Sequence, residues 1–271
     1  MSIIQYAGAL ASQSNGYDSD AQAYFSRMVV NPGSIVKSAV NRAVLDLKAC
    51  GYWSKLDFLQ LVCLNTSQQS FLDLKRPTKQ GAIYGSAAFI ANVGVHGSLS
   101  GTSYYDTDFT DSVDGVNFTL NDNAFFLFVR DKAASAGAYA SFGGASGGSN
   151  NTSIGEYMAA GEVWGNAVST TNLVSSAGAS ANQVLYVHNR VSSSDVKLYK
   201  AGSVIASGSH APSAFAGFPI YVGATNGSGT LFWQNDANIS IVGAGGSMSS
   251  GQITTVTNIF NTLLTDLSVI P

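Results

Sequence analysis

The sequence predicts a mainly β protein: an antiparallel β-sandwich with one helix near the N-terminus and another at the C-terminus. Three observations favour this fold. Short apolar segments recur along the chain between small polar turns, which is typical of a sandwich and not of βαβ units. Glycine is abundant, with 29 residues, and only 11% of all residues are charged, against about 25% in an average soluble protein. Helical periodicity is clear in two segments only.

The first of these segments begins near Asn31 and ends before Gly51. Asn31 is a good N-cap, and Pro32 suits the first helical position because its missing N–H is not needed there. Gly51 is the expected left-handed stop. The apolar residues between them recur at helical spacing, at Val36, Val40, Ala43, Val44 and Leu47. We expect this helix to pack across one end or face of a sheet.

The strands are predicted from apolar runs and from turn residues. The run at residues 56–64 is almost wholly apolar and predicts a strand buried on both faces. A glycine-rich hairpin or rim loop is expected at 141–155, and an Ala-Gly turn predicts a hairpin over 196–209. Further strands are expected at 89–95, 124–130, 183–189, 218–224 and 238–243. The chain closes with a second helix, because Ser249 and Gln252 form a capping box before an apolar stripe.

The chain divides into two unequal parts. Residues 1–23 are small and polar without a clear period, and they predict an N-terminal arm that orders only against a partner. Residues 24–271 form one sandwich domain with its flanking helices. The net charge of −3 and the absence of a basic run argue against nucleic-acid binding. The sequence has no apolar run long enough for membrane insertion.

One stretch carries a resemblance to a known family. In residues 41–63, NRAVLDLKACGYWSKLDFLQLVC, a helix ends at Gly51, a W-x-K-L-D motif runs from Trp53 to Asp57, and an apolar strand follows. This resembles the opening signature of bacteriophage virion proteins with a concanavalin A-like (laminin G-like) sandwich domain. Residues 93–109 resemble a later segment of the same family, with Asp108 where the family has glycine. The matches extend over residues 24–267.

The resemblance implies a scaffold and a biological setting. The fold would be a concanavalin A-like jelly roll, and the protein a non-enzymatic structural component of the virion exterior, either a capsid decoration or part of a tail or fibre. Its partners would be other virion proteins and further copies of itself, and it would be made in the host cytoplasm. The first alternative is a carbohydrate-binding adhesion module that recognises a host surface glycan, and the second is a glycan-degrading enzyme.

The densest charged feature is an acidic stretch that holds Asp106, Asp108, Asp111 and Asp114. Calcium prefers several oxygen ligands from one loop, so Asp106, Asp108 and Asp111 are candidate ligands for Ca²⁺. The spacing does not fit an EF-hand loop, and a solvated acidic loop is the alternative. We expect no other cofactor.

Aromatic residues beside polar loops are the candidates for sugar binding. Sugars are recognised by an aromatic platform flanked by a few hydrogen-bonding groups. Trp233 is followed closely by Asn235 and Asp236, and Trp164 also adjoins a polar loop, as do Phe232 and Tyr104. Packing at a strand edge is the alternative explanation for these residues.

The enzyme alternative depends on two glutamates. Glycoside hydrolysis needs two carboxylates placed across the scissile bond. Glu156 and Glu162 are the only glutamates, and they stand six residues apart. Alternation along a single strand would put both on the same face, but the segment GEYMAAGE lacks a strand pattern. We therefore expect no catalytic residues in this protein.

Overall fold

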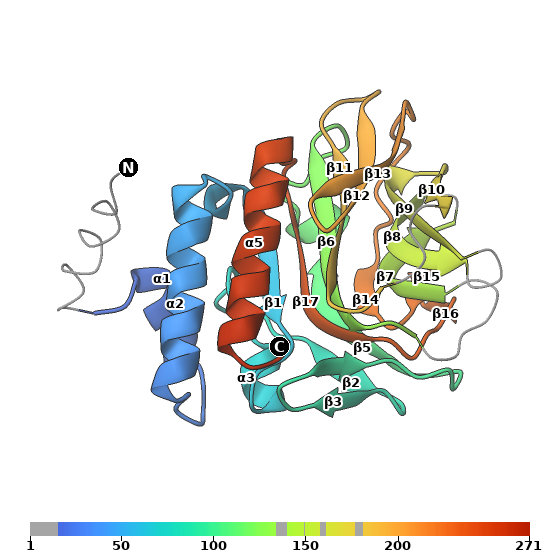
Figure 1. Ribbon diagram of the computed structural model, residues 1–271. Helices are drawn as coiled ribbons and strands as arrows, with labels where there is room; N and C mark the ends of the chain where they lie inside the picture. The colour runs from blue at the N-terminus through green and yellow to red at the C-terminus, as the bar shows by residue number, and fades with distance from the viewer. Residues whose placement is uncertain (1–15, 134–139, 149, 158–160, 177–180) are drawn as a thin grey trace.

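Two β-sheets face each other as a sandwich (Figure 1). The computed structural model describes residues 16–133, 140–148, 150–157, 161–176 and 181–271. Within these residues strand pairing is antiparallel with one exception, and helices lie near both ends of the described chain. The predicted class, a mainly β antiparallel sandwich with flanking helices, is confirmed.

The first sheet has eight strands. Seven of them follow the order β13-β12-β11-β6-β17-β4-β3, and β1 also pairs with β17. Its strands are β1 (Leu56–Leu61), β3 (Ala88–Ile90), β4 (Gly94–His96), β6 (Asn123–Asp131), β11 (Val184–Arg190), β12 (Val196–Lys200), β13 (Ser203–Gly208) and β17 (Asn238–Gly245). The predicted hairpin over 196–209 is confirmed, with Ala201 and Gly202 both at positive φ as its tight turn requires.

The second sheet has nine strands. Seven follow the order β10-β9-β8-β7-β14-β5-β2, and the short hairpin β15–β16 joins through a parallel pairing of β15 with β7. Its strands are β2 (Ala82–Tyr84), β5 (Tyr104–Thr110), β7 (Ala140–Gly147), β8 (Asn150–Tyr157), β9 (Glu162–Ser169), β10 (Leu173–Ser175), β14 (Pro219–Val222), β15 (Thr225–Gly227) and β16 (Thr230–Phe232). The glycine-rich segment around residue 148 is therefore a hairpin of two eight-residue strands.

The longer helices form a third layer on the eight-stranded sheet. The helical elements are α1 (Ser19–Ser26), α2 (Ser34–Ala49), the 3₁₀ turn η1 (Trp53–Lys55), α3 (Ser67–Phe71), α4 (Asp111–Asp114) and α5 (Ser250–Asp266). Helices α2 and α5 lie side by side against the outer face of that sheet (Figure 1). Among the described residues, none of the helices is both long enough and apolar enough to cross a bilayer.

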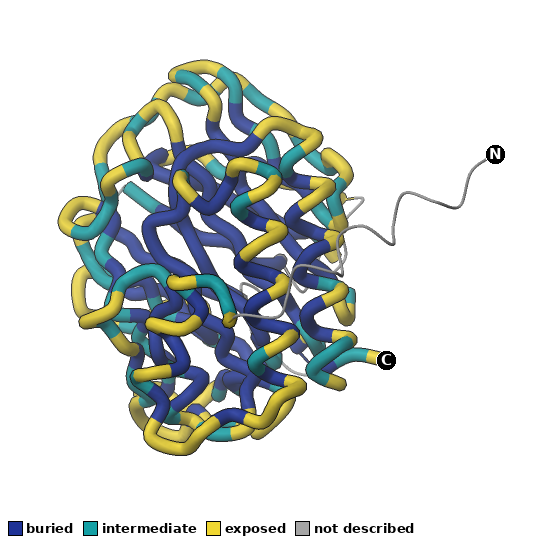
Figure 2. Tube along the Cα trace, turned by 90° about the vertical axis from the view of Figure 1, so that its left-hand side faces the viewer, coloured by how far each residue is buried: buried dark blue, intermediate teal, exposed yellow. Residues whose placement is uncertain are grey.

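Strand β6 shows why its sequence is apolar throughout. Successive side chains of a strand point to opposite faces. Phe125 and Leu127 therefore enter the core between the sheets, whereas Phe126 and Phe128 enter the core beneath the helices. Both faces are buried, as the continuous dark core in Figure 2 illustrates. The prediction that residues 56–64 are buried on both faces is also confirmed, because every residue of this run is buried, although strand β1 itself ends at Leu61.

The motif residue Asp57 has a clear structural role. Its buried carboxylate accepts backbone hydrogen bonds from Val116 (3.0 Å) and Phe118 (2.7 Å), and from Asn117 between them. These bonds fasten the segment that follows α4 to strand β1. Charge-assisted hydrogen bonds of this kind are stronger than neutral ones.

Two predicted boundaries differ from the structure. Helix α2 begins at Ser34 with Gly33 as its N-cap, so the prediction of Asn31 as the cap is wrong. Pro32 is buried just ahead of the helix, next to the extended N-cap Gly33. The stop at Gly51 is confirmed by its φ of 75°.

Helix α1 begins at Ser19, inside the predicted arm, and its Ala21 and Tyr24 are buried. Residues 1–15 lie outside the described residues.

The capping box of α5 is confirmed, and it supports a stability prediction. The Ser249 hydroxyl accepts from the backbone N–H of Gln252 at 3.2 Å, and the Gln252 side chain accepts from the Ser249 N–H at 3.0 Å. Ser249→Ala is expected to lower the free energy of unfolding by about 1 kcal/mol, because a helix N–H loses its partner. Ser250→Ala, one residue inside the helix, is the matched control for denaturant titrations. Equal losses in the two variants would contradict the assignment of the cap.

Candidate functional site

The outer face of the nine-stranded sheet lies opposite the layer of α2 and α5 (Figure 1). Alternation along its strands identifies the side chains on this face. Val163 points into the core between the sheets, so Trp164 points outward from β9. By the same alternation Tyr221 points outward from β14 and Tyr104 from β5. We call this surface the outer sheet face.

The structure brings the two predicted tryptophans together on the outer sheet face. The rings of Trp164 and Trp233 meet edge to face with centroids 5.5 Å apart. Trp164 is 2% exposed and Trp233 is 37% exposed, so a ligand would contact Trp233 while Trp164 supports it from below. Trp233 has a φ of 52°, a left-handed conformation that is uncommon for a bulky residue. Phe232 lies beside it at 6.4 Å and is also exposed.

The two polar residues predicted beside Trp233 are placed differently from each other. Asn235 is fully buried, its backbone N–H donates to the Gly223 carbonyl, and its Oδ1 accepts from the Ala237 N–H at 3.0 Å. This side chain shapes the turn into β17, and a ligand contact by Asn235 is not supported. Asp236 is half-buried on the same turn.

Three tyrosines that lie far apart in sequence form a stack on the outer sheet face. They come from the neighbouring strands β2, β5 and β14. The Tyr84 and Tyr104 rings stack with centroids 4.9 Å apart, and the Tyr104 and Tyr221 rings stack at 4.0 Å. Burial, a hydrogen bond with the Tyr104 side chain and the nearby Asp106 raise the pKa of Tyr221 above its ordinary value. Only Tyr104 of the three was a sequence candidate, because strand register, which the sequence does not display, brings the others to it.

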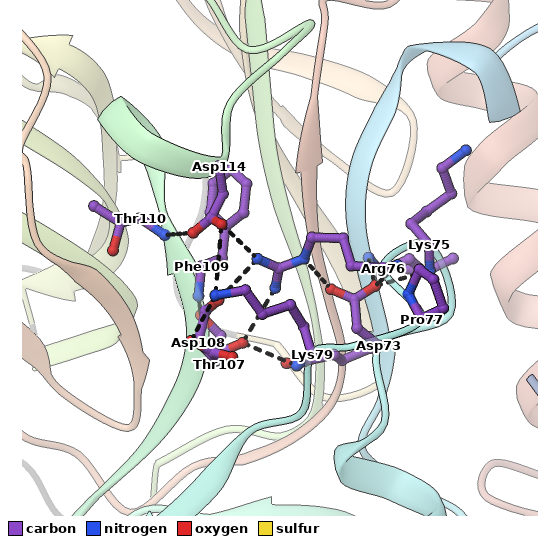
Figure 3. Close-up of polar contacts among 12 residues, drawn as sticks. Asp73, Lys75, Arg76, Pro77, Lys79, Thr107, Asp108, Phe109, Thr110 and Asp114 are labelled. Atoms are coloured by element: carbon purple, nitrogen blue, oxygen red, sulfur yellow. Dashed lines mark hydrogen bonds and ion pairs between the residues drawn. The ribbon is translucent and has the colours of Figure 1, made fainter. Parts of the chain in front are cut away.

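The acidic stretch is neutralised by basic side chains from the turn after α3. Figure 3 shows the Arg76 guanidinium between Asp73 and Asp114, at 2.5 Å and 3.4 Å from their carboxylates. Lys79 reaches the Asp108 carboxylate at 3.1 Å and the Asp114 carboxylate at 3.7 Å. Of the three predicted calcium ligands, Asp108 is therefore already paired with a lysine, and its neighbour Asp114 is paired with both basic side chains.

The remaining predicted calcium ligands point to different surroundings. The carboxylate of Asp111 is buried, and it accepts from the backbone N–H groups of Ala216 and Gly217, each at 3.0 Å. Asp106 lies on the outer sheet face and accepts from the Asp108 N–H. Among the described residues no group of three or more His, Cys, Asp or Glu side chains is arranged to hold a metal ion. The candidate site at Asp106, Asp108 and Asp111 is not supported.

The register of β8 and β9 separates the two glutamates. Glu156 of β8 pairs with Val163 of β9, so these two side chains share a face of the sheet. Glu162 precedes Val163 on the same strand and therefore occupies the opposite face. The two glutamates belong to different, paired strands, so alternation along a single strand does not apply to them, as the missing strand pattern of GEYMAAGE predicted. Two carboxylates on opposite faces cannot flank one glycosidic bond.

Comparisons with known proteins show likeness of fold. No protein-family model matches the sequence, and no curated protein matches it either. Among solved structures, domain 4 of AbnA, a GH43 extracellular arabinanase from Geobacillus stearothermophilus solved in complex with arabinotriose, is 16% identical with a TM-score of 0.51. That match covers 75% of this chain and 98% of the arabinanase domain.

A second solved structure has a similar fold. The binding domain of botulinum neurotoxin serotype D is 10% identical with a TM-score of 0.53, over 76% of this chain and 52% of the toxin domain. The chain thus matches about half the length of that toxin domain. These two likenesses place the chain among β-sandwich domains of this architecture.

Proposed function

We propose that this chain is a non-enzymatic carbohydrate-binding domain whose ligand lies on the outer sheet face. The observation that carries the proposal is the exposed aromatic surface of Phe232 and Trp233, supported by the buried Trp164, on the side of the sandwich opposite α2 and α5. The C–H faces of a sugar pack on such rings, and hydroxyl and amide groups around them bond to its hydroxyls. The arabinanase domain of similar fold was solved with arabinotriose, which supports the capacity of this architecture for a saccharide.

Trp233→Ala is expected to weaken saccharide binding by at least about tenfold. Loss of one buried aromatic contact is worth roughly 1.5–3 kcal/mol, and each 1.4 kcal/mol is a factor of ten in affinity. The measurement is a glycan array followed by isothermal titration of the strongest ligand. Trp233→Phe, which keeps a ring over Trp164, is expected to retain part of the affinity.

The control for this experiment lies on the opposite side of the molecule. Leu45 of α2 is 38% exposed, nearly the same as Trp233, and Leu45→Ala should bind like the unchanged protein. Thermal unfolding of each variant separates lost binding from lost structure. If the unchanged protein binds no glycan on a broad array, the proposed function is wrong.

We also propose, from the resemblance to bacteriophage virion proteins, that the domain belongs to the exterior of a phage particle. Exposed apolar side chains at the entry to α2 support an assembly contact: Val29 is 84% exposed, Val30 56% and Ile35 68%. Clustered apolar exposure of this kind marks interaction surfaces. Cryo-electron microscopy of purified particles of the phage that encodes this chain should find the chain at regular sites on the exterior. Its absence from purified particles would contradict this second proposal.

A further inference from the structure

A groove beside the tyrosine stack forms a second feature of the outer sheet face. Its volume is about 550 Å³, within the range of about 300–1,000 Å³ that is usual for small-molecule sites. Tyr84 and Tyr104 line one part of it, and Thr230 and Leu231 of the β15–β16 hairpin line another. Gly101 and Thr102, which belong to the loop before β5, also line the groove. We infer that this groove binds an uncharged oligosaccharide.

The shape of the groove suits a sugar ring. Tyr84 belongs to the edge strand β2 and is 46% exposed, so the ring surface that Tyr104 does not cover is open to a ligand. The stack on Tyr104 and Tyr221 holds Tyr84 in place, which lowers the entropy lost when a ligand binds. Thr102 and Thr230 are exposed and bring hydroxyl groups to the same groove. An apolar platform with a few polar groups is the arrangement that saccharides need.

The loop and the segment after the hairpin are tied together. The Gln234 side chain donates to the Ser100 carbonyl at 3.1 Å, so the segment after β16 is bound to the loop that carries Gly101. Ser86 and Ser103 are joined by a further hydrogen bond of 2.8 Å across the base of the same loop. The groove is therefore preformed, and a ligand would not have to order its walls.

The charges around the groove decide the class of saccharide. Every described residue that lines it is uncharged. Asp106 lies two residues from Tyr104 on the same face and pairs across strands with Tyr221, so a carboxylate stands beside the stack. The cation of Lys79 is engaged by Asp108 and Asp114. A sialylated or sulfated glycan would find no cationic side chain among the described residues that line the groove, whereas a neutral glycan needs none.

This inference rests on the proposed function: it names the class of the saccharide ligand and a further surface that contacts it. The first test fills the groove with a larger side chain and does not remove a contact. Gly101 is exposed, and a Cβ built on it meets no atom within 4 Å, so the fold has room for a side chain there. Gly101→Trp should fill the groove and weaken binding at least tenfold, whereas Gly101→Ala should bind within twofold of the unchanged protein. Tyr84→Ala should also weaken binding at least tenfold.

The probes are uncharged oligosaccharides on an array, each printed beside its sialylated or sulfated counterpart, followed by titration calorimetry. Binding to the neutral member of each pair, with affinity unchanged between low and high salt, is the expected result. Two outcomes would overturn the inference while the proposed function stands: binding that Trp233→Ala abolishes but Gly101→Trp and Tyr84→Ala leave intact, or selective binding of the charged glycans. Absence of any glycan binding by the unchanged protein would instead reject the proposed function itself.

Discussion

Arg76→Met is expected to lower the free energy of unfolding by about 3–5 kcal/mol, because it removes the cation from a buried charge cluster. The guanidinium lies among the carboxylates of Asp73 and Asp114 and donates to the Asp108 carbonyl at 2.8 Å (Figure 3). It also lies over the ring of Phe109 at 5.2 Å. Methionine keeps much of the apolar volume but leaves the Asp73 carboxylate, which is fully buried, without its charged partner.

The control for this prediction is an ion pair on the surface. Lys197 and Asp195 are 2.9 Å apart and both exposed to solvent, and such pairs contribute about 0–1 kcal/mol. Lys197→Met should therefore change stability by less than 1 kcal/mol in the same denaturant titrations. A loss no larger for Arg76→Met than for Lys197→Met would show that the cluster around Arg76 does not hold the turn after α3 to β5.

Acidification is expected to destabilise the protein by about 3 kcal/mol between pH 7 and pH 4 through one residue, His188. Burial, with a smaller effect from the charges of Arg190 and His210, lowers the pKa of His188 from 6.5 to about 3. The unfolded chain takes up a proton near pH 6.5, whereas the folded protein keeps this imidazole neutral. The stability is fully present above pH 6.5 and is lost as the pH falls toward 3.

The packing of His188 explains why it stays neutral. The side chain of this β11 residue is 2% exposed and packs beside Gly165, where an added Cβ would lie 3.6 Å from the ring. Its Nδ1 has no hydrogen-bond partner among the described residues. His188→Phe should therefore lose about 3 kcal/mol less stability than the unchanged protein over this pH range. His96→Gln, at a half-buried histidine bonded to Asn238, is the control and should keep the full loss. Identical pH profiles for His188→Phe and the unchanged protein would refute the assignment.

The candidate site was only partly visible in the sequence. Trp233 and Trp164 could be proposed because each adjoins polar loop residues, and the structure pairs them. Asn235 has the same local context but is buried by the turn into β17. No local sequence pattern points to Tyr84 or Tyr221 as part of a site. Each matters only because its ring stacks on Tyr104, and the order of the strands β2, β5 and β14 makes that contact possible.

For the charged residues too, the sequence showed only which residues are close along the chain and not which are close in the fold. Three aspartates of the acidic stretch were candidates for a cation site, but Arg76 and Lys79, which lie earlier in the chain, supply the positive charge that compensates Asp108 and Asp114. Glu156 and Glu162 are close in sequence, yet the pairing of β8 with β9 puts them on opposite faces of the sheet. In both cases spacing along the chain was a poor guide to spacing in the fold.

The sequence by itself determined the features that depend on near neighbours. The capping box of α5, the stop at Gly51, the hairpin of β12 and β13 and the doubly buried run that holds β1 all follow from residues a few positions apart, because capping, turn geometry and apolar runs are local properties. The tertiary structure alone decided which strands pair and in what register. Alternation tells which residues share a face of one strand, but the neighbouring strand is selected by packing of the whole core. The tyrosine stack, the paired tryptophans and the compensated aspartates depend on that selection.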